Sequence, residues 1–265
     1  MNVLSNKEAV MSNMQQAAAT QSTPARIPTF IDLRAFARDS APGHPLPEVA
    51  RDDVFLSSRR LLDLALGPVT VGVMSLPAGG GLVPCQPADE FIIVCAGKLT
   101  LTVAEQGRTL VLGPNNSAVI QHGAAFSWSA QEPVSVIFMR HGGSQPDGRG
   151  IVPVREHAPM APSNPPLAEL LLTPAPACRN HTDHRSTDGT FSCGIWDSTP
   201  YHRRAMLYRH HELMYLLEGS VTFVDESGRS GTFSKGDIFL VEQNARCSWE
   251  SRDRVAKVFA LYRPA

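Results

Sequence analysis

Two histidines and a glutamate stand together near the end of the sequence, in the stretch YRHHELMYLLEG from Tyr208 to Gly219. Imidazole nitrogens and carboxylate oxygens are the donors that bind zinc, iron or nickel in proteins. A carboxylate in an apolar setting can instead have a raised pKa and act as an acid or base. The stretch therefore predicts a metal site or a metal-free polar site. Which of the two is formed depends on which side chains share one face of the strand.

Strand geometry divides the residues of this stretch into two sets, because alternate residues of a strand share a face. One face would carry Tyr208, His210, Glu212 and Met214. His211 would lie on the other face and is expected to point outward. A single bulge would exchange the two histidines, so the alternation alone leaves their order open.

The elements that position these residues occur twice in the chain. The stretch DEFIIVCAGKLTLTV, residues 89–103, aligns with HELMYLLEGSVTFV, residues 211–224, at an offset of about 120 residues. The residues that coincide across the repeat are Glu90 with Glu212, Gly97 with Gly219, Gly123 with Asn244 and Trp128 with Trp249. A tryptophan that recurs at one repeat position indicates core packing. The repeat is a duplicated domain, since its period is far too long for a solenoid.

The duplicated unit has the pattern of a β-barrel or sandwich. Segments such as KLTLTV, SVTFV and DIFLVE alternate with period two, and the turns between them carry Gly, Asn, Asp and Pro. The apolar runs at residues 59–66 and 167–173 are too short to predict helices. The predicted organisation is a disordered tail at 1–28, an N-terminal unit at 29–142, a Gly- and Pro-rich linker at 143–166 and a C-terminal unit at 167–265.

Composition excludes several classes of function. The formal net charge of −1 gives no global attraction to nucleic acid or to an anionic membrane. No apolar run is long enough to span a bilayer, and the N-terminal residues lack the pattern of a secretory signal. The five cysteines have no C-x-x-C spacing, which disfavours a disulfide framework or a structural zinc site. We expect a reduced cytoplasmic protein without a nucleic-acid or membrane partner.

The motif residues resemble those of the cupin superfamily. The glutamate and glycine of ELMYLLEG, and the Gly-Asp that opens GDIFLVEQNARCSW, resemble the two conserved cupin motifs. With GIWDSTPY and RVAKVFALY, the second unit resembles the subfamily of ethanolamine-utilisation and ureidoglycine-aminohydrolase-like cupins. The resemblance implies an all-β chain of two tandem jelly-roll (double-stranded β-helix) barrels, packed as an intramolecular pseudo-dimer. It specifies no activity, because cupins carry many chemistries.

Neither unit has the ligand set that the cupin resemblance implies for a metal. The H-x-H that usually precedes the motif glutamate is replaced in the second unit by Ala205 and Leu207, or by Met206 and Tyr208. The place of the third histidine holds Cys247 in the second unit and Phe126 in the first. A divalent transition metal is therefore only one of the occupants left open, and its ligands here would be His210 and Glu212.

The candidate site belongs to the C-terminal barrel, because the second unit and its linker contain six of the nine histidines. In cupins the motif glutamate faces the barrel interior, which makes Glu212 the candidate catalytic acid or base. Tyr208, His210, Cys247 and Met214 are the candidate substrate-binding residues. The N-terminal barrel would serve as a degenerate partner.

Three other groups of polar residues are expected to be exposed. Lys257 is expected to be an exposed strand lysine on the face opposite Val258. Arg203 and Arg204 are expected to form a solvated charge run, with binding of a carboxylate as the alternative. The stretch RNHTDHR, residues 179–185, is expected to be a solvated loop.

These observations predict a small-molecule-binding bicupin. One hypothesis is an enzyme of amine or ureide metabolism with its site in the C-terminal barrel. The alternative is a non-catalytic ligand-binding or sensor protein that has lost the usual metal ligands. A further homodimer is left open, as is the question of whether the chain is an enzyme.

Overall fold

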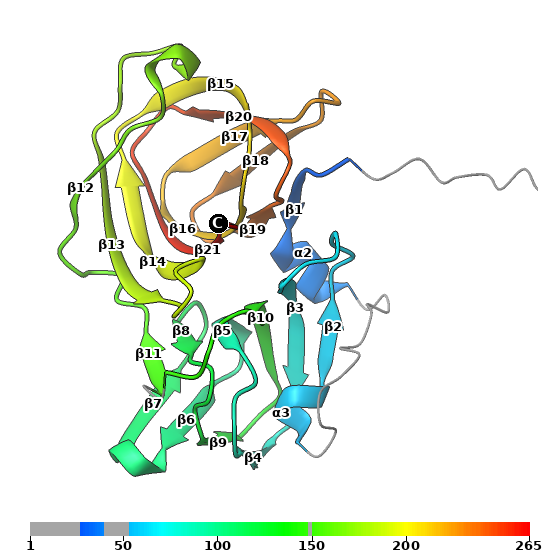
Figure 1. The fold of residues 1–265 in the computed structure, drawn as a ribbon. Coiled ribbons are helices and arrows are strands. Elements are labelled where there is room, and N and C mark those ends of the chain that lie inside the picture. The colour runs from blue at the N-terminus through cyan, green and yellow to red at the C-terminus, as the bar shows by residue number, and fades with distance from the viewer. Residues whose placement is uncertain (1–26, 40–52, 148–149) are drawn as a thin grey trace, which may run out of the picture.

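The computed structural model describes residues 27–39, 53–147 and 150–265, and it contains two β-barrels, one from each repeat (Figure 1). Most of the tail expected at 1–28 lies outside the described residues. The prediction of a nearly all-β tandem of barrels is confirmed. Within the described residues, no helix is both long and apolar enough to cross a membrane.

The N-terminal barrel is formed by two sheets that face each other. The six-stranded sheet has the order β11 (Ile151–Pro153), β8 (Ser117–Ile120), β5 (Asp89–Ala96), β10 (Val134–His141), β3 (Val69–Leu76) and β2 (Arg59–Leu61). The four-stranded sheet has the order β4 (Gly79–Val83), β9 (Phe126–Ala130), β6 (Leu99–Val103) and β7 (Arg108–Leu112). The 3₁₀ turn η1 (Ala104–Gln106) links β6 to β7.

The C-terminal barrel repeats this plan with a larger first sheet. Its seven strands are β1 (Phe30–Asp32), β19 (Ile238–Val241), β16 (His211–Glu218), β21 (Val255–Tyr262), β14 (Phe191–Ser198), β13 (Cys178–Arg185) and β12 (Ala161–Ser163). The second sheet comprises β15 (Tyr201–Leu207), β20 (Arg246–Ser251), β17 (Ser220–Val224) and β18 (Ser230–Ser234). The 3₁₀ turn η2 (Ala168–Leu170) precedes β13.

The duplicated turns have the same backbone geometry in both barrels. Gly97 and Gly219, which end β5 and β16, have φ angles of 79° and 76°. A side chain at Gly219 would also collide with the Arg254 carbonyl oxygen. Gly123 and Asn244 share φ angles of 86° and 70°, which glycine and asparagine adopt most readily. The sequence repeat is therefore a repeat of structure.

Several short segments form regular structure that the predicted organisation did not include. β1 pairs with β19 of the C-terminal barrel, although the sequence boundary places Phe30–Asp32 in the N-terminal unit. Within the expected linker, β11 pairs with β8 and β12 pairs with β13. Two short helices that the sequence did not predict, α2 (Leu33–Arg38) and α3 (Val54–Ser57), begin at side-chain caps from Asp32 and Asp53.

The larger sheets of the two barrels pack against each other. Their outward side chains form one apolar cluster to which both barrels contribute, for example Val71, Ile93 and Ile137 from the first and Leu213 and Leu240 from the second. The strands of these sheets are therefore buried on both faces, one toward a barrel interior and one toward the other barrel. In such strands the alternation of side chains cannot distinguish buried from exposed positions.

Candidate functional site

The C-terminal barrel contains a cavity of about 300 Å³ that is lined by strands β13 to β16, β20 and β21. Its polar lining includes Asn180, Arg203, Tyr208, His210, Glu212 and Lys257. Its aromatic walls include Trp196, Tyr201 and Trp249, and residues 164–166 border it. A concave site with apolar walls and a few convergent polar groups is the usual form of a ligand pocket.

The motif glutamate lies inside the barrel and is paired with a lysine. Glu212 stands opposite Val241 on β19 and Leu261 on β21. Lys257 Nζ donates to Glu212 Oε1 at 2.8 Å, and His210 Nε2 lies 3.4 Å from Glu212 Oε2. Burial disfavours the charged carboxylate, but the Lys257 ammonium and then the His210 ring outweigh it and hold the pKa of Glu212 well below its usual range. Glu212 therefore stays ionised at neutral pH.

Lys257 is buried, which corrects the expectation of an exposed strand lysine. It is 5% exposed, and its Nζ also lies 3.1 Å from Met214 Sδ. The ammonium sits over the rings of Trp196 and Trp249, 4.8 and 5.3 Å from their centroids. These faces stabilise a buried cation in addition to the carboxylate.

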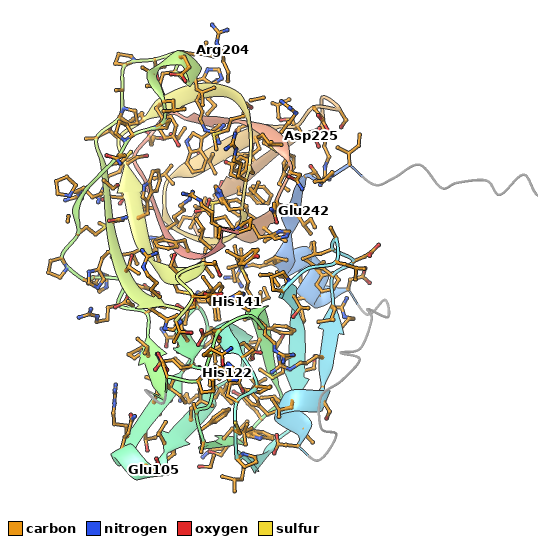
Figure 2. All side chains as sticks on the ribbon, viewed as in Figure 1. Glu105, His122, His141, Arg204, Asp225 and Glu242 are labelled. Carbon is orange, nitrogen blue, oxygen red and sulfur yellow. The ribbon has the colours of Figure 1, made fainter. Side chains whose placement is uncertain are left out.

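A second cation, Arg203, is also buried and lines the cavity, so the expectation of a solvated charge run is wrong for this residue. It is 3% exposed and donates from Nη2 to Tyr208 Oη at 2.5 Å. Its Nη1 donates to the Cys247 carbonyl oxygen at 2.9 Å. Arg204, the next residue, is exposed and points away from the barrel (Figure 2). Arg203 is two residues after the aromatic Tyr201 on β15. This spacing could have indicated that Arg203 shares the inward face with Tyr201 and that Arg204 does not.

The two histidines of the opening stretch face different environments. His210 lines the cavity with Tyr208, and their rings lie 5.2 Å apart. His211, the first residue of β16, does not line the cavity, and its Nδ1 accepts from the Gln243 backbone amide at 3.1 Å. Burial, and then the charge of His210, lower the pKa of His211 to about 4.

Two of the candidate binding residues do not line the cavity. Cys247 is fully buried in the apolar core of the barrel, and burial raises the pKa of its thiol to about 11. Met214 is also fully buried, and its Sδ accepts from Lys257 Nζ. Only Tyr208, His210 and Glu212 of the predicted set reach the cavity. The sequence prediction missed Lys257 as a cavity residue and gave a binding role for Arg203 only as the alternative to a solvated charge run.

The donor set does not fit a bound metal. Among the described residues, no three His, Cys, Asp or Glu side chains converge on a common point. His210 and Glu212 supply two donors, and Lys257 already holds the carboxylate with its positive charge. A cation beside that ammonium would meet direct repulsion. The hypothesis that these two residues bind a metal is therefore not supported by the geometry.

The interior of the N-terminal barrel is filled by its own side chains. Arg59 donates from both terminal nitrogens to Glu90, at 2.5 and 2.9 Å, and both side chains are almost fully buried. Phe55 of α3 packs against Phe126, with ring centroids 5.2 Å apart. Glu90, which is equivalent to Glu212, is therefore occupied in a packed core.

The stretch expected as a solvated loop is strand β13, and it contributes to the contact between the barrels. His184 is 4% exposed, and its Nε2 lies 3.5 Å from Asp89 of the N-terminal barrel. Its Nδ1 lies 3.3 Å from the Gln121 amide nitrogen. The many polar residues of β13 reflect this contact and the wall of the cavity.

Comparisons with known proteins agree with this architecture. Residues 185–259 match the family of EutQ-like cupin domains. No curated protein matches the chain. The structure of a DUF861-family protein of unknown function from Pseudomonas syringae pv. tomato str. DC3000 is 30% identical, with a TM-score of 0.78, and the match covers 88% of this chain and 99% of that one.

Two more distant structures share the fold alone. Protein Ylba from E. coli, of the DUF861 family, is 10% identical with a TM-score of 0.51 over 91% of this chain and 94% of its own. A mutant of the salicylate 1,2-dioxygenase from Pseudoaminobacter salicylatoxidans is 12% identical, with a TM-score of 0.51 over 89% and 84%. With the 30% identical relative matched over nearly its whole length, the chain belongs to the DUF861 family of the cupin superfamily.

Proposed function

We propose that the C-terminal barrel binds a small polar molecule without the help of a metal. The observation that carries this proposal is the contrast between the two barrels. Glu212, Lys257 and His210 open onto a cavity of about 300 Å³, whereas Glu90 is enclosed by Arg59 in a packed interior. A buried ion pair is costly to desolvate, and its position at a cavity is typical of a polar anchor for a ligand.

Within this function we propose an enzyme of amine or ureide metabolism, a proposal that rests on the likeness of the second unit to ethanolamine-utilisation and ureidoglycine-aminohydrolase-like cupins. The low pKa of Glu212 does not suit a general acid, because an ionised carboxylate has no proton to give. His210 suits proton transfer better, with Glu212 Oε2 beside its Nε2 to fix the ring and Lys257 nearby to stabilise negative charge. The dioxygenase of the same fold shows only that such barrels can carry enzymes.

The second candidate function is a non-catalytic ligand sensor. It is favoured by the pairing of Glu212 with Lys257, which neutralises the one carboxylate that the described part of the chain contributes to the cavity lining. Turnover distinguishes the two candidates. A ligand that binds and is recovered chemically unchanged after long incubation supports the sensor, and formation of a product supports the enzyme.

The experiment is a thermal-shift screen of the untagged chain against amines, ureides and sugar acids, followed by calorimetry. Met206→Trp places a large ring in the cavity lining, and Leu207→Trp places the same ring on the neighbouring residue, which does not line the cavity. A ligand of this site raises the melting temperature of the wild type and of Leu207→Trp but not of Met206→Trp. Binding that survives in Met206→Trp contradicts the proposed site.

Metal content is measured on the same samples by elemental analysis. We expect ligand binding to persist after treatment with a chelator. Binding that is lost on chelation and restored by one divalent metal contradicts metal-independent recognition.

A further inference from the structure

The cavity of the C-terminal barrel contains more positive than negative charge. Arg203 and Lys257 are 3% and 5% exposed, and Glu212 is the only carboxylate among the described residues that line the cavity. Lys257 is paired with that carboxylate. No described carboxylate makes an ion pair with Arg203, whose acceptors are the hydroxyl of Tyr208 and the backbone carbonyls of Cys247 and Arg204.

A buried guanidinium with only neutral partners lacks a counter-charge. Proteins pair buried charges, since an isolated ion is expensive to remove from water. The Tyr208 hydroxyl does not supply the missing negative charge. Burial raises the pKa of Tyr208, and the neighbouring Arg203 only partly offsets this effect. The tyrosine therefore remains protonated at neutral pH.

Several donors beside this guanidinium have no acceptor among the described residues. Nη1 of Arg203 donates to the two carbonyls, and Nη2 uses one hydrogen on Tyr208. The Nε–H and the second hydrogen of Nη2 are left, according to the five-donor inventory of arginine. The Tyr208 oxygen accepts from Arg203, so its own proton is also free to donate.

We propose that Arg203 and Tyr208 bind the anionic group of a small organic ligand, a carboxylate or another oxyanion. The inference rests on the proposed function and narrows its ligand class. The planar fork of arginine matches the two oxygens of a carboxylate, and the tyrosine hydroxyl adds a third donor. Trp249, which is the strand partner of Arg203, and Trp196 form a wall for the apolar remainder of the ligand.

Lys257 extends the same recognition. Its Nζ uses one hydrogen on Glu212 and one on Met214 Sδ, and an ammonium has three. The third hydrogen gives the ligand a further donor from the opposite sheet. Arg203 and Lys257 together carry one more charge than Glu212, and the negative charge of the ligand would balance this excess.

The alternative is that Arg203 only ties β15 to β20 through the Cys247 carbonyl. If the role of Arg203 is only structural, the protein needs the hydrogen-bond donors of its guanidinium but not its positive charge. Binding of an anion and of its uncharged analogue separates the two roles, because only a counter-charge role discriminates between them.

The test uses benzoate, its neutral analogue benzamide, and inorganic phosphate as probes, with isothermal titration calorimetry of the full chain. We expect saturable binding of benzoate, the planar acid, and none of benzamide at the same concentrations. Arg203→Gln should weaken benzoate binding by about thirtyfold or more, since it removes one partner of a buried charge pair. Arg204→Gln removes an exposed charge from the next residue and should leave binding unchanged (Figure 2). Phosphate that competes with benzoate identifies the oxyanion as the recognised group.

Tyr208→Phe provides a second variant if Arg203→Gln fails to fold, because it removes one hydroxyl and keeps the ring. It should also weaken benzoate. The inference is overturned if benzamide binds as tightly as benzoate, if Arg203→Gln and Tyr208→Phe bind benzoate like the wild type, or if neither anion binds at all.

Failure of this inference can be distinguished from failure of the proposed function. If an amine or a neutral ureide binds in a manner that Met206→Trp abolishes, and no anion competes with it, the cavity binds ligands but not anions. If Met206→Trp leaves the binding of every ligand intact, the cavity itself is not the site.

Discussion

The glutamate of the first cupin motif is neutralised by a cation in both barrels, but the cation comes from a different element in each. Glu212 is paired with Lys257 of β21, and Glu90 is paired with Arg59 of β2. Val136 is the repeat equivalent of Lys257, so the N-terminal barrel has no cation on β10 at that place. A buried carboxylate at this position therefore needs a compensating charge whether or not a cavity is present.

Replacement of Lys257 by Met should lower the free energy of unfolding by about 3 kcal/mol, because it leaves the Glu212 carboxylate buried without its partner. The double variant Lys257→Met, Glu212→Gln should lose less than the sum of the two single changes. Urea unfolding measures both effects. Arg252→Gln, which breaks an exposed pair with Glu250, should cost less than about 0.5 kcal/mol. Additive losses would contradict coupling of the buried pair.

His211 makes stability depend on pH, because its pKa is about 4 in the folded chain and 6.5 in the unfolded chain. Well above pH 6.5 the His211 ring is neutral in both the folded and the unfolded chain. As the pH falls from 6.5 to 4, the unfolded chain binds a proton that the folded chain refuses, so stability is lost by about 2 to 3 kcal/mol. His211→Gln should flatten the unfolding free energy in this window, and the exposed His157→Gln should not. An unchanged slope in His211→Gln would disprove the assignment.

At the scale of elements, the N-terminal strand β1 completes the C-terminal barrel. Phe30 is 1% exposed and packs against Phe223 and Phe233, with ring centroids 5.8 and 5.9 Å away. The Thr29 hydroxyl donates to Asp225 Oδ2 at 2.6 Å. A strand from before the first barrel thus fills part of the core of the second, and the two repeats are not separable at the boundary between them.

Phe30→Ala should cost about 3 to 4 kcal/mol, the usual loss for a buried phenylalanine. A Cβ at Gly231 would lie 2.4 Å from the Phe30 ring, so Gly231→Ala should also destabilise the barrel. In the Phe30→Ala background the ring is absent, so Gly231→Ala should lower the free energy of unfolding by less. A double-mutant cycle in urea measures this difference. Ile27→Ala, on the same segment and 46% exposed, is the control and should have little effect.

At the scale of the whole molecule, the two barrels share one apolar interface. Its core contains Val73, Ile93 and Ile137 from one barrel and Leu213 and Val258 from the other. Polar groups at its edges add directional contacts. Arg34 of α2 donates to the carbonyl oxygen of Gly236 and to Asn115 Oδ1, both at 2.5 Å, and so connects turns of both barrels. We therefore expect the barrels to unfold together.

Ile93→Asp places an uncompensated charge in this interface and should cost at least about 3 kcal/mol. Differential scanning calorimetry should show one transition for the wild type and two for the variant, as the barrels lose their common core. Val111→Asp introduces the same charge at an exposed position of the N-terminal barrel and should keep one transition. Two transitions in the wild type would show that the interface does not couple the barrels.

The sequence alone determined the duplication, the all-β class and the cupin identity. These rest on local requirements that leave a direct trace, such as the left-handed turn at Gly219 and the period-two strands. Tyr208 and His210 lie in the connection between β15 and β16 and not in a strand, so their position beside Glu212 did not follow from strand alternation. The short helices left no such trace, because each is fixed by one cap and by packing rather than by periodicity.

Only the tertiary structure decided which polar residues face the cavity. Side chains on both faces of β21 are buried, so the alternation of residues along this strand could not indicate that Lys257 faces the barrel interior. Arg203 and Arg204 are adjacent and chemically identical, and the pairing of β15 with β20 sends one inward and the other to solvent. Burial of a charge depends on partners distant in sequence, such as Glu212 for Lys257, and those partners meet only when the barrel closes.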